Sequence, residues 1–337
     1  MGRNRPGEGT GRSYVKLHTK FAVAIGLALT MASPLAASAQ DYPDRPVQII
    51  VPLSPGSLSD LTIRKLAPDL AKTLGTSVVI DNRPGAGAAI GTAAAKQEAP
   101  DGYTLVLAAA SSFSINPHLR EDLAYDPMAD FAPICRIGGA PQLLAANPSL
   151  GVTTAAELVE KAKTETIPFA SSGPGTISHL AQEMLKSRMH VDFLHAPYKG
   201  TGPAITDTIA GHTKLMFESP GPMLGAIREG QLVPLGVLSP QRLPALPDVP
   251  TFEELGFGDM ELIGWIGLAA PVGTPAEVID TLAKACETAV VNPDFHEFSD
   301  EQGLVAFFAS PAEFAAHIKA DFEKFGALVE RSGLQPE

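Results

Sequence analysis

The sequence predicts an α/β fold with two lobes. Short apolar runs alternate with helical patterns along almost the whole chain, which is typical of sheets whose strands are each followed by a helix. Without its first 39 residues the chain has 298 residues, too many for one typical domain and enough for two. Two junctions far apart in the sequence share one design: an apolar strand, a turn rich in Pro, Gly and Ser, and then a helix.

The first 39 residues have the parts of a secretory signal peptide. A basic region from Arg3 to Lys20 precedes an apolar run from Phe21 to Met31, and Ala37–Ala39 is a small-residue cleavage site. A transmembrane anchor is the alternative, but the run is shorter than the roughly 20 residues that a spanning helix needs. We therefore expect cleavage near Ala39 and an exported chain. The basic region is longer than usual, which suggests a true start further downstream.

Charge and cysteine content narrow the class of protein. Loss of the first 39 residues removes five basic residues and one acidic residue, and changes the net charge from −12 to −16. Nucleic acid and anionic membranes need a basic face, so neither is an expected partner. Cys135 and Cys286 lie among apolar residues; we expect buried free thiols, with a disulfide as the alternative in an exported protein. The scattered histidines predict no metal site.

Eight short apolar runs have the length and composition of buried strands. They are 47–51, 78–81, 104–108, 143–147, 167–170, 193–198, 215–218 and 233–239. The turns Ser54–Ser57 and Ser171–Thr176 follow the first and fifth runs. A helix N-terminus has unpaired amides and the positive end of a dipole, so each junction is suited to an anion, and a small carboxylate fits between them.

Helical patterns follow the same runs. Leucines recur at every fourth position from Leu66 to Leu74 in a helix that begins near Leu58, and Thr153 or Thr154 with Glu157 forms a capping box that opens a helix through Lys163. Near the C-terminus, Thr274-Pro275 and Ser310-Pro311 each place a cap before a proline at the first helical position. The expected helices run to about Val291 and Val329.

No low-complexity linker divides the chain. The apolar segments 134–146 and 263–270 are therefore candidates for two crossings between the lobes, which would make the lobe that contains both termini discontinuous. Ligands of such folds bind at the carboxyl ends of strands and in clefts between lobes. The sequence thus predicts a ligand cleft between the lobes.

Eight motifs are specific enough to indicate a family. They are Val51–Ser57 with Asp60 and Arg64, Asp81–Gly87 with Ile90-Gly91, Pro100–Leu105, Asp130–Pro133, Ser171–Thr176 with His179-Leu180, Pro197–Gly200, Leu246–Thr251, and Trp265 with Gly267. In order and spacing they resemble the Bug-type solute receptors of the tripartite tricarboxylate transporter family. The resemblance runs from about Tyr42 to the C-terminus.

The resemblance implies a type II-like periplasmic binding protein fold whose two α/β lobes close on a small carboxylate. It implies a first lobe made of 40–140 and 266–337, a second lobe made of 141–265, and membrane permease subunits as partners. We expect a monomer in the periplasm, without a cofactor. Family ligands include carboxylates of central metabolism, acidic amino acids, nicotinate-like acids and aromatic dicarboxylates.

The candidate ligand-binding residues come from both junctions. The first junction supplies backbone amides and hydroxyls for a carboxylate, while Asp60, itself an acid, is expected to cap the helix or order water. The second supplies a matching loop, and the strand ends nearby add further candidates. The full set is Leu53, Ser54, Gly56, Ser57, Ser59, Asp60, Ala110, Ser111, Ser172, Gly173, Thr176, His179, Tyr198 and Glu218.

Several of these residues, and Lys199 beside them, have a simpler structural explanation. The first loop could be a plain capped turn, His179 a helix-surface or interface residue, Tyr198 a packing residue at a strand end, and Lys199 a solvated lysine. Gly85–Gly87 lacks the spacing of a dinucleotide loop, so a tight turn or a close backbone approach to ligand explains it better. Trp265 is the only Trp and is expected to report closure.

Three positions depart from the family pattern. Ser57 stands where the family usually has a second glycine; a positive φ there would strain it, so either the loop bends differently or the hydroxyl meets the ligand. Leu53 replaces a frequent Phe and would widen the pocket floor. Glu218-Ser219 replaces Asp-Asn, and Glu218 would meet a cationic or hydroxylated part of a ligand or be a salt-bridged wall residue.

Two other functions are alternatives to solute capture. A secreted hydrolase would need a nucleophilic serine on a Gly-x-Ser-x-Gly elbow, and the sequence has none. A ligand sensor that signals to a membrane partner would use the same fold and the same cleft. Solute capture is the function that the resemblance favours, with no catalytic residue expected.

Overall fold

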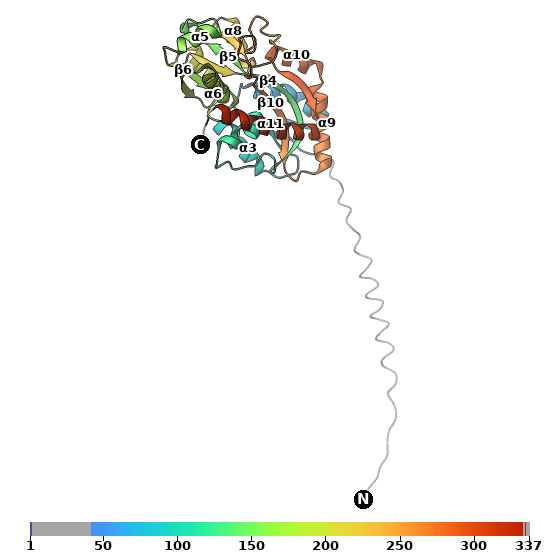
Figure 1. The fold of residues 1–337 in the computed structure, drawn as a ribbon. Helices are drawn as coiled ribbons and strands as arrows, with labels where there is room; N and C mark the ends of the chain where they lie inside the picture. Colours follow the sequence, from blue (N-terminus) through green and yellow to red (C-terminus); the bar gives the residue numbers. More distant parts are fainter. Residues whose placement is uncertain (2–41, 333, 335–337) are drawn as a thin grey trace. The chain divides into compact units, whose positions relative to one another are not determined.

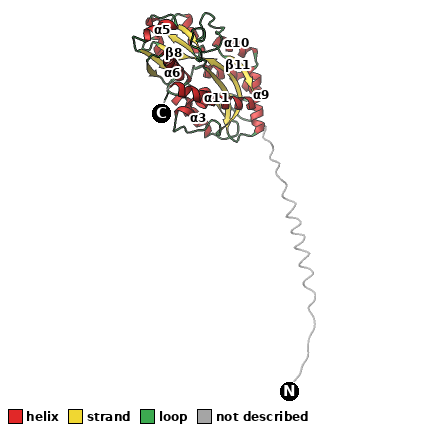
Figure 2. Cartoon of the chain, viewed as in Figure 1, coloured by secondary structure: helices red, strands yellow, loops and turns green. Residues whose placement is uncertain are grey.

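The computed structural model describes Met1, residues 42–332 and Leu334. The signal peptide expected over 1–39 therefore falls, apart from Met1, outside the described residues. Helices and strands alternate through the described part of the chain (Figure 2). Among the described residues, no helix combines the length and the apolar character needed to span a bilayer.

The first sheet has six strands in the order β11-β4-β10-β3-β1-β2. β1 is parallel to β2 and β3, whereas β10 is antiparallel to β3 and β4, and β11 is antiparallel to β4. The strands are β1 (Val47–Val51), β2 (Val78–Asn82), β3 (Thr104–Ala109), β4 (Phe131–Pro141), β10 (Ile263–Pro271) and β11 (Val305–Ala309). This sheet is thus built from both ends of the chain.

Helices from both ends of the chain also accompany the first sheet. They are α2 (Leu58–Leu74), α3 (Ala89–Lys96), α4 (Asn116–Leu119), α9 (Ala276–Val290), α10 (Pro293–Gln302) and α11 (Pro311–Ser332), with short helical turns η1 (Ala86–Ala88) and η2 (Ser111–Ile115). α2 packs against α9, and both α9 and α11 pack against β4. We call this sheet with its helices the first lobe.

The second sheet has five strands in the order β7-β6-β8-β5-β9. They are β5 (Leu143–Ala146), β6 (Ile167–Ser171), β7 (Phe193–Pro197), β8 (Leu215–Glu218) and β9 (Val233–Val237), and the helical elements between them are η3 (Pro148–Leu150), α5 (Ala155–Ala162), α6 (Ile177–Met189), α7 (Thr201–Ile209), η4 (Gly221–Met223) and α8 (Leu224–Arg228). Figure 1 shows these elements grouped around β5 and β6, apart from β4, β10 and α9. We call this group the second lobe.

Two connections join the lobes: Gln142 between β4 and β5, and the segment 238–262 between β9 and β10. β4 of the first sheet ends at Pro141 and β5 of the second begins at Leu143, with Gln142 between them. The Gln142 amide donates to the carbonyl of Leu262, the residue before β10, at 3.2 Å, and the Gln142 carbonyl accepts from the Leu238 amide at 2.8 Å. Both connections are thus held by the same group of backbone hydrogen bonds.

The structure confirms the α/β prediction and places a strand at each of the eight expected runs, within two residues at either end. The Thr154–Glu157 capping box is present, and Ser310 with Glu313 forms the equivalent pair before α11. The prediction for the helix after Thr274 was wrong in detail. α9 begins at Ala276, so Pro275 holds the N-cap position, and the Thr274 hydroxyl donates instead to the Pro271 carbonyl.

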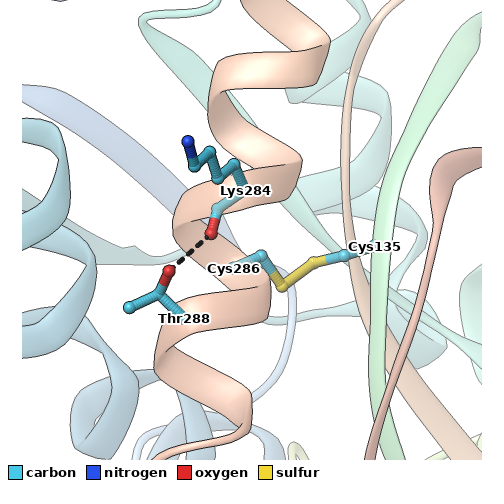
Figure 3. The surroundings of a disulfide bond; sticks show 4 residues. All are labelled: Cys135, Lys284, Cys286 and Thr288. Atoms are coloured by element: carbon cyan, nitrogen blue, oxygen red, sulfur yellow. Dashed lines mark hydrogen bonds between the residues drawn. A yellow bond between two sulfur atoms is a disulfide. The ribbon is translucent and has the colours of Figure 1, made fainter.

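The expectation of free thiols was wrong as well. Cys135 on β4 and Cys286 on α9 form a disulfide, with an S–S distance of 2.02 Å and a Cα–Cα distance of 6.6 Å (Figure 3). Both side chains are buried, as expected, but α9 packs on β4 and brings the two sulfurs together. Spacing along the sequence could not reveal this contact, because 151 positions separate the two cysteines.

Candidate functional site

The loop after β1 ends at an α2 N-terminus with unused donors. Gly56 takes the positive φ of 79°, while Ser57 has an ordinary φ of −67° and caps the helix by accepting from the Asp60 amide. Ser57 is therefore unstrained, and its hydroxyl proton stays available. Among the described residues, the amides of Leu58 and Ser59 have no hydrogen-bond acceptor, as expected for the first positions of a helix.

Asp60 holds this loop in shape from behind. Its carboxylate accepts from the Gly56 amide at 2.9 Å, from Arg64 Nε at 3.0 Å and from Asn82 Nδ2 at 2.9 Å. Burial opposes ionisation, but the hydrogen bonds from Arg64, Gly56 and Asn82 outweigh it and lower the pKa of Asp60. Asp60 thus fixes the path of the loop as an anion.

The matching loop of the second lobe uses most of its donors internally. The Ser172 amide donates to Ser178 Oγ at 2.9 Å, and the Gly173 amide donates to Ser171 Oγ at 3.2 Å. Thr176 caps α6 by accepting from the His179 amide at 3.4 Å. Among the described residues, the Ser178 amide has no acceptor. This loop is therefore more self-contained than the one in the first lobe.

A cavity of about 80 Å³, which we call the inner cavity, lies between the two junctions. Its lining comes from both sheets and from both connections between the lobes: Leu53, Ser57, Leu58, Ser59, Ala109, Ala110, Ser111, Ala140, Gln142, Ser172, Thr176, Ile177, Ser178, Thr201, Glu218, Ser219, Gly264, Trp265, Ile266 and Leu304. Two buried lining atoms, Gln142 Oε1 and Trp265 Nε1, have no partner among the described residues. The cavity therefore offers unpaired polar atoms as well as apolar walls.

Glu218 is the one ionisable side chain among the described residues of this lining. Its side chain is buried, and its Oε2 accepts from the hydroxyls of Ser172 and Thr201, the latter at 2.8 Å. Oε1 accepts from the amide of Ser219 at 2.9 Å and from its hydroxyl at 3.0 Å. No described Lys, Arg or His forms an ion pair with Glu218, so the alternative of a salt-bridged wall residue was wrong.

Contacts across the cleft hold the lobes closed. The Thr201 amide donates to Ser54 Oγ at 3.1 Å, and the Ile177 amide donates to Ser111 Oγ at 3.2 Å. A Cβ on Gly87 would come within 2.5 Å of the Pro174 carbonyl oxygen, so the turn at 85–88 lies directly against the second lobe. The glycine there permits both a positive φ and this close approach.

A second cavity of about 440 Å³ lies beside the first and shares Leu53, Ser172, Thr176 and Thr201 with it. The turn 84–88 and the segment Tyr198–Thr201 line it, together with Ser54 and Gly173. The Tyr198 hydroxyl donates to Asp207 at 2.8 Å, so the tip of this side chain has a structural partner.

The structure thus brings most of the predicted site residues together. Eight of them, Leu53, Ser57, Ser59, Ala110, Ser111, Ser172, Thr176 and Glu218, line the inner cavity, and Ser54, Gly173 and Tyr198 line the neighbouring one. Gly56, Asp60 and His179 line neither cavity. Gly56 and Asp60 shape the α2 loop, as described above.

His179 packs away from both cavities. It is buried and stacks on His195, with ring centroids 4.3 Å apart and planes at 8°. Burial, and then the neighbouring His195, lower the pKa of His179 to about 4. His195 Nε2 in turn lies 2.6 Å from Ser171 Oγ, the atom that accepts from the Gly173 amide. The pair therefore supports the loop of the second lobe.

Sequence reasoning missed several lining residues. Thr201 follows a glycine in the Pro197–Gly200 motif and begins α7, which the sequence analysis did not predict. Gln142 lies inside one proposed crossing, but nothing in the sequence pattern marked its side chain as part of a site.

In the described part of the chain, no cluster of three or more His, Cys, Asp or Glu side chains could hold a metal ion.

Two α/β lobes, with a polar cavity between two strand–turn–helix junctions, define the class of two-lobed binding proteins. The family follows from direct comparison. Residues 62–334 match the family described as the tripartite tricarboxylate transporter family receptor, and the chain belongs to this family. The Bug-type resemblance found in the sequence is thereby confirmed.

Solved structures give the same result. The periplasmic binding protein BugD is 34% identical, with a TM-score of 0.85 over 88% of this chain and 100% of its own. Rpa4515 from R. palustris, solved with adipate, is 28% identical, with a TM-score of 0.85 over 88% of this chain and 100% of its own. MatC from Rhodopseudomonas palustris, with bound malate, is 28% identical, with a TM-score of 0.82 over 86% of this chain and 100% of its own.

Proposed function

We propose that this protein captures a small carboxylate in the periplasm by closing its two lobes around it, and that it binds this ligand without catalysing a reaction on it. The observation that carries the proposal is the inner cavity, where donors without protein partners face a space enclosed by both lobes. Receptors of the same fold hold adipate and malate, which supports a carboxylate as the ligand class.

The carboxylate would lie at the α2 N-terminus. The unpaired amides of Leu58 and Ser59 and the hydroxyl of Ser57 supply donors there, and the helix dipole favours a negative charge. Ser111 Oγ adds a hydroxyl proton, since the Ile177 amide that bonds to it uses only its acceptor side. An anion can therefore be held without a basic side chain, despite the negative charge of the protein.

We propose lobe boundaries at 40–140 with 266–337 and at 141–265, with Pro141 and residues 263–265 at the connections, where they still belong to strands of the first sheet. Opening at the connections near Gln142 and Leu262 would let the ligand in, and closure would bring Ser54 to Thr201 and Ser111 to Ile177. The closed form presents one composite surface from both lobes. We propose that membrane permease subunits of a tripartite transporter recognise this surface, after export with cleavage near Ala39.

The test is thermal unfolding of the mature chain, stripped of bound ligand by unfolding and refolding with the disulfide intact, against a panel of carboxylates. A ligand at about 100 times its Kd stabilises the folded state by roughly 2.7 kcal/mol. The panel should include citrate-cycle acids, acidic amino acids, nicotinate and aromatic dicarboxylates. Stabilisation by none of these would contradict the proposal.

A matched pair of variants tests the place of binding. Leu58→Pro removes an unpaired amide at the first helical position, where proline is tolerated and where the preceding Ser57 is already extended. Leu58→Ala loses the same side chain but keeps the amide. We expect Leu58→Pro to bind the stabilising carboxylate at least tenfold more weakly than Leu58→Ala, and equal affinities would exclude this amide as a ligand contact.

A further inference from the structure

Two chemically different groups line the inner cavity. One is the α2 loop, whose donors have no protein acceptor among the described residues. The other, which we call the acidic group, is the Glu218 carboxylate with three hydroxyls, those of Ser172, Thr201 and Ser219. A ligand in the cavity can therefore meet the donors of the α2 loop and this acidic group.

The hydroxyls of the acidic group have no proton to offer a ligand. Each hydroxyl carries one proton, and Ser172, Thr201 and Ser219 all direct theirs to Glu218. Their remaining capacity is as acceptors. Ser172, a candidate ligand-binding residue from the sequence, thus presents lone pairs to the cavity.

The charge of Glu218 also favours a cationic group on the ligand. The carboxylate of Glu218 is buried and receives only neutral hydrogen bonds, and no described basic side chain pairs with it. Buried charges are normally paired, and an unpaired one is costly. A second carboxylate on the ligand would repel it and find no donor hydroxyl on this wall.

We propose that the ligand is a carboxylate that also carries an ammonium group, with its carboxylate at the α2 loop and its ammonium at Glu218. This assignment rests on the proposed function and names its ligand class. An ammonium has three donors and no acceptor, which matches the lone pairs of Ser172 and Thr201 and the charge of Glu218. Glu218 then determines specificity by selecting a cation over a neutral or negative group.

The test measures Kd, through Trp265 fluorescence or calorimetry, for ligands that differ only at the far end. One set is γ-aminobutyrate, γ-hydroxybutyrate and succinate; the other is ε-aminohexanoate and adipate, with glycine and β-alanine as shorter amino acids. The best amino acid should bind the wild-type protein at least tenfold more tightly than the hydroxy acid or dicarboxylate of the same length. This ranking needs no variant.

Glu218→Gln supplies the second measurement. Its amide can still accept from the Ser219 amide while its NH₂ donates to Ser172 or Thr201, which frees a hydroxyl proton for the ligand. The variant should lose at least tenfold in affinity for the amino acid and gain affinity for the dicarboxylate. Glu229→Gln, at an exposed position of the second lobe, removes the same charge and should change neither Kd.

The outcomes separate this inference from the proposed function. If a dicarboxylate binds the wild-type protein most tightly, or the hydroxy acid binds as well as the amino acid, the ammonium assignment is wrong and carboxylate capture stands. If Glu218→Gln folds and leaves the ranking unchanged, Glu218 is not the specificity determinant. If no carboxylate of any kind binds, the proposed function itself fails.

Discussion

The backbone amide of Thr201 in α7 donates a hydrogen bond of 3.1 Å to the hydroxyl oxygen of Ser54 in the loop after β1, across the cleft between the lobes. A Cβ on the neighbouring Gly200 would collide with the same oxygen, so the two segments are in direct contact. Thr201 also lines the inner cavity. The contact that closes the cleft and the wall of the cavity thus share one residue.

Ser54→Ala should weaken ligand binding by destabilising the closed form. In the open form both groups are hydrated, so the variant loses about 0.5–1.5 kcal/mol only on closure, or roughly two- to tenfold in Kd. Calorimetry with the carboxylate identified above measures this. Ser149→Ala, which removes a surface hydroxyl that accepts from Lys214, is the control and should bind normally. Unchanged affinity in Ser54→Ala would show that the contact does not contribute to closure.

Asp60→Asn should disturb the α2 loop. The substitution removes the charge that accepts from Gly56, Arg64 and Asn82 at a buried position, and we expect a loss of about 2 kcal/mol in unfolding free energy. Ligand affinity should fall as well, because the loop that carries the unpaired amides loses its support. Urea unfolding and calorimetry check both effects. Wild-type values for both would mean that the network is dispensable.

Stability should fall on acidification as the unfolded chain protonates at His179. Burial, then His195, lower its pKa from 6.5 to about 4, so the folded state binds the proton less readily than the unfolded state. The contribution of neutral His179 to the free energy of unfolding is complete above about pH 6.5. It decreases by about 3 kcal/mol as the pH falls toward 4. His179→Phe keeps a ring against His195 and should flatten this part of the unfolding profile. A variant profile parallel to that of the wild type would refute the assignment.

Reduction of the disulfide should destabilise the protein. A cross-link between residues 151 positions apart restricts the unfolded chain, which corresponds to about 3–5 kcal/mol. Urea unfolding of oxidised and reduced wild-type protein measures the difference without a substitution at a buried site. Ligand affinity should change little, because neither cysteine lines the cavity. Equal midpoints in the two states would contradict the prediction.

Local sequence signals predicted the parts of the fold that depend on neighbours in sequence. The strand Val47–Val51, the Ser57 cap and the Thr154–Glu157 box each rest on residues within a few positions of one another. Thr274 shows the limit, since its hydroxyl found a nearby carbonyl instead of the helix. The Cys135–Cys286 bond depends on how α9 packs on β4, which no local pattern encodes.

The candidate site likewise contains residues that local sequence signals identify and residues whose role depends on the fold. Ser57 and Ser59 were identifiable because a helix N-terminus follows a strand, and that geometry is local. The role of Glu218 depends on hydroxyls contributed by the loop after β6, by α7 and by its own neighbour, so the direction of these hydrogen bonds is set only by folding. His179 has the position of a ligand residue in the sequence, but its ring turns toward His195 on β7.

The disulfide also has a topological consequence. Both of its cysteines belong to the first lobe, and the chain between them contains all five strands of the second sheet. The second lobe is therefore a covalent ring tied at its base to the first. A protease that cuts one loop of that ring produces two fragments that remain linked, so the nicked protein migrates as one chain until a thiol reductant separates it.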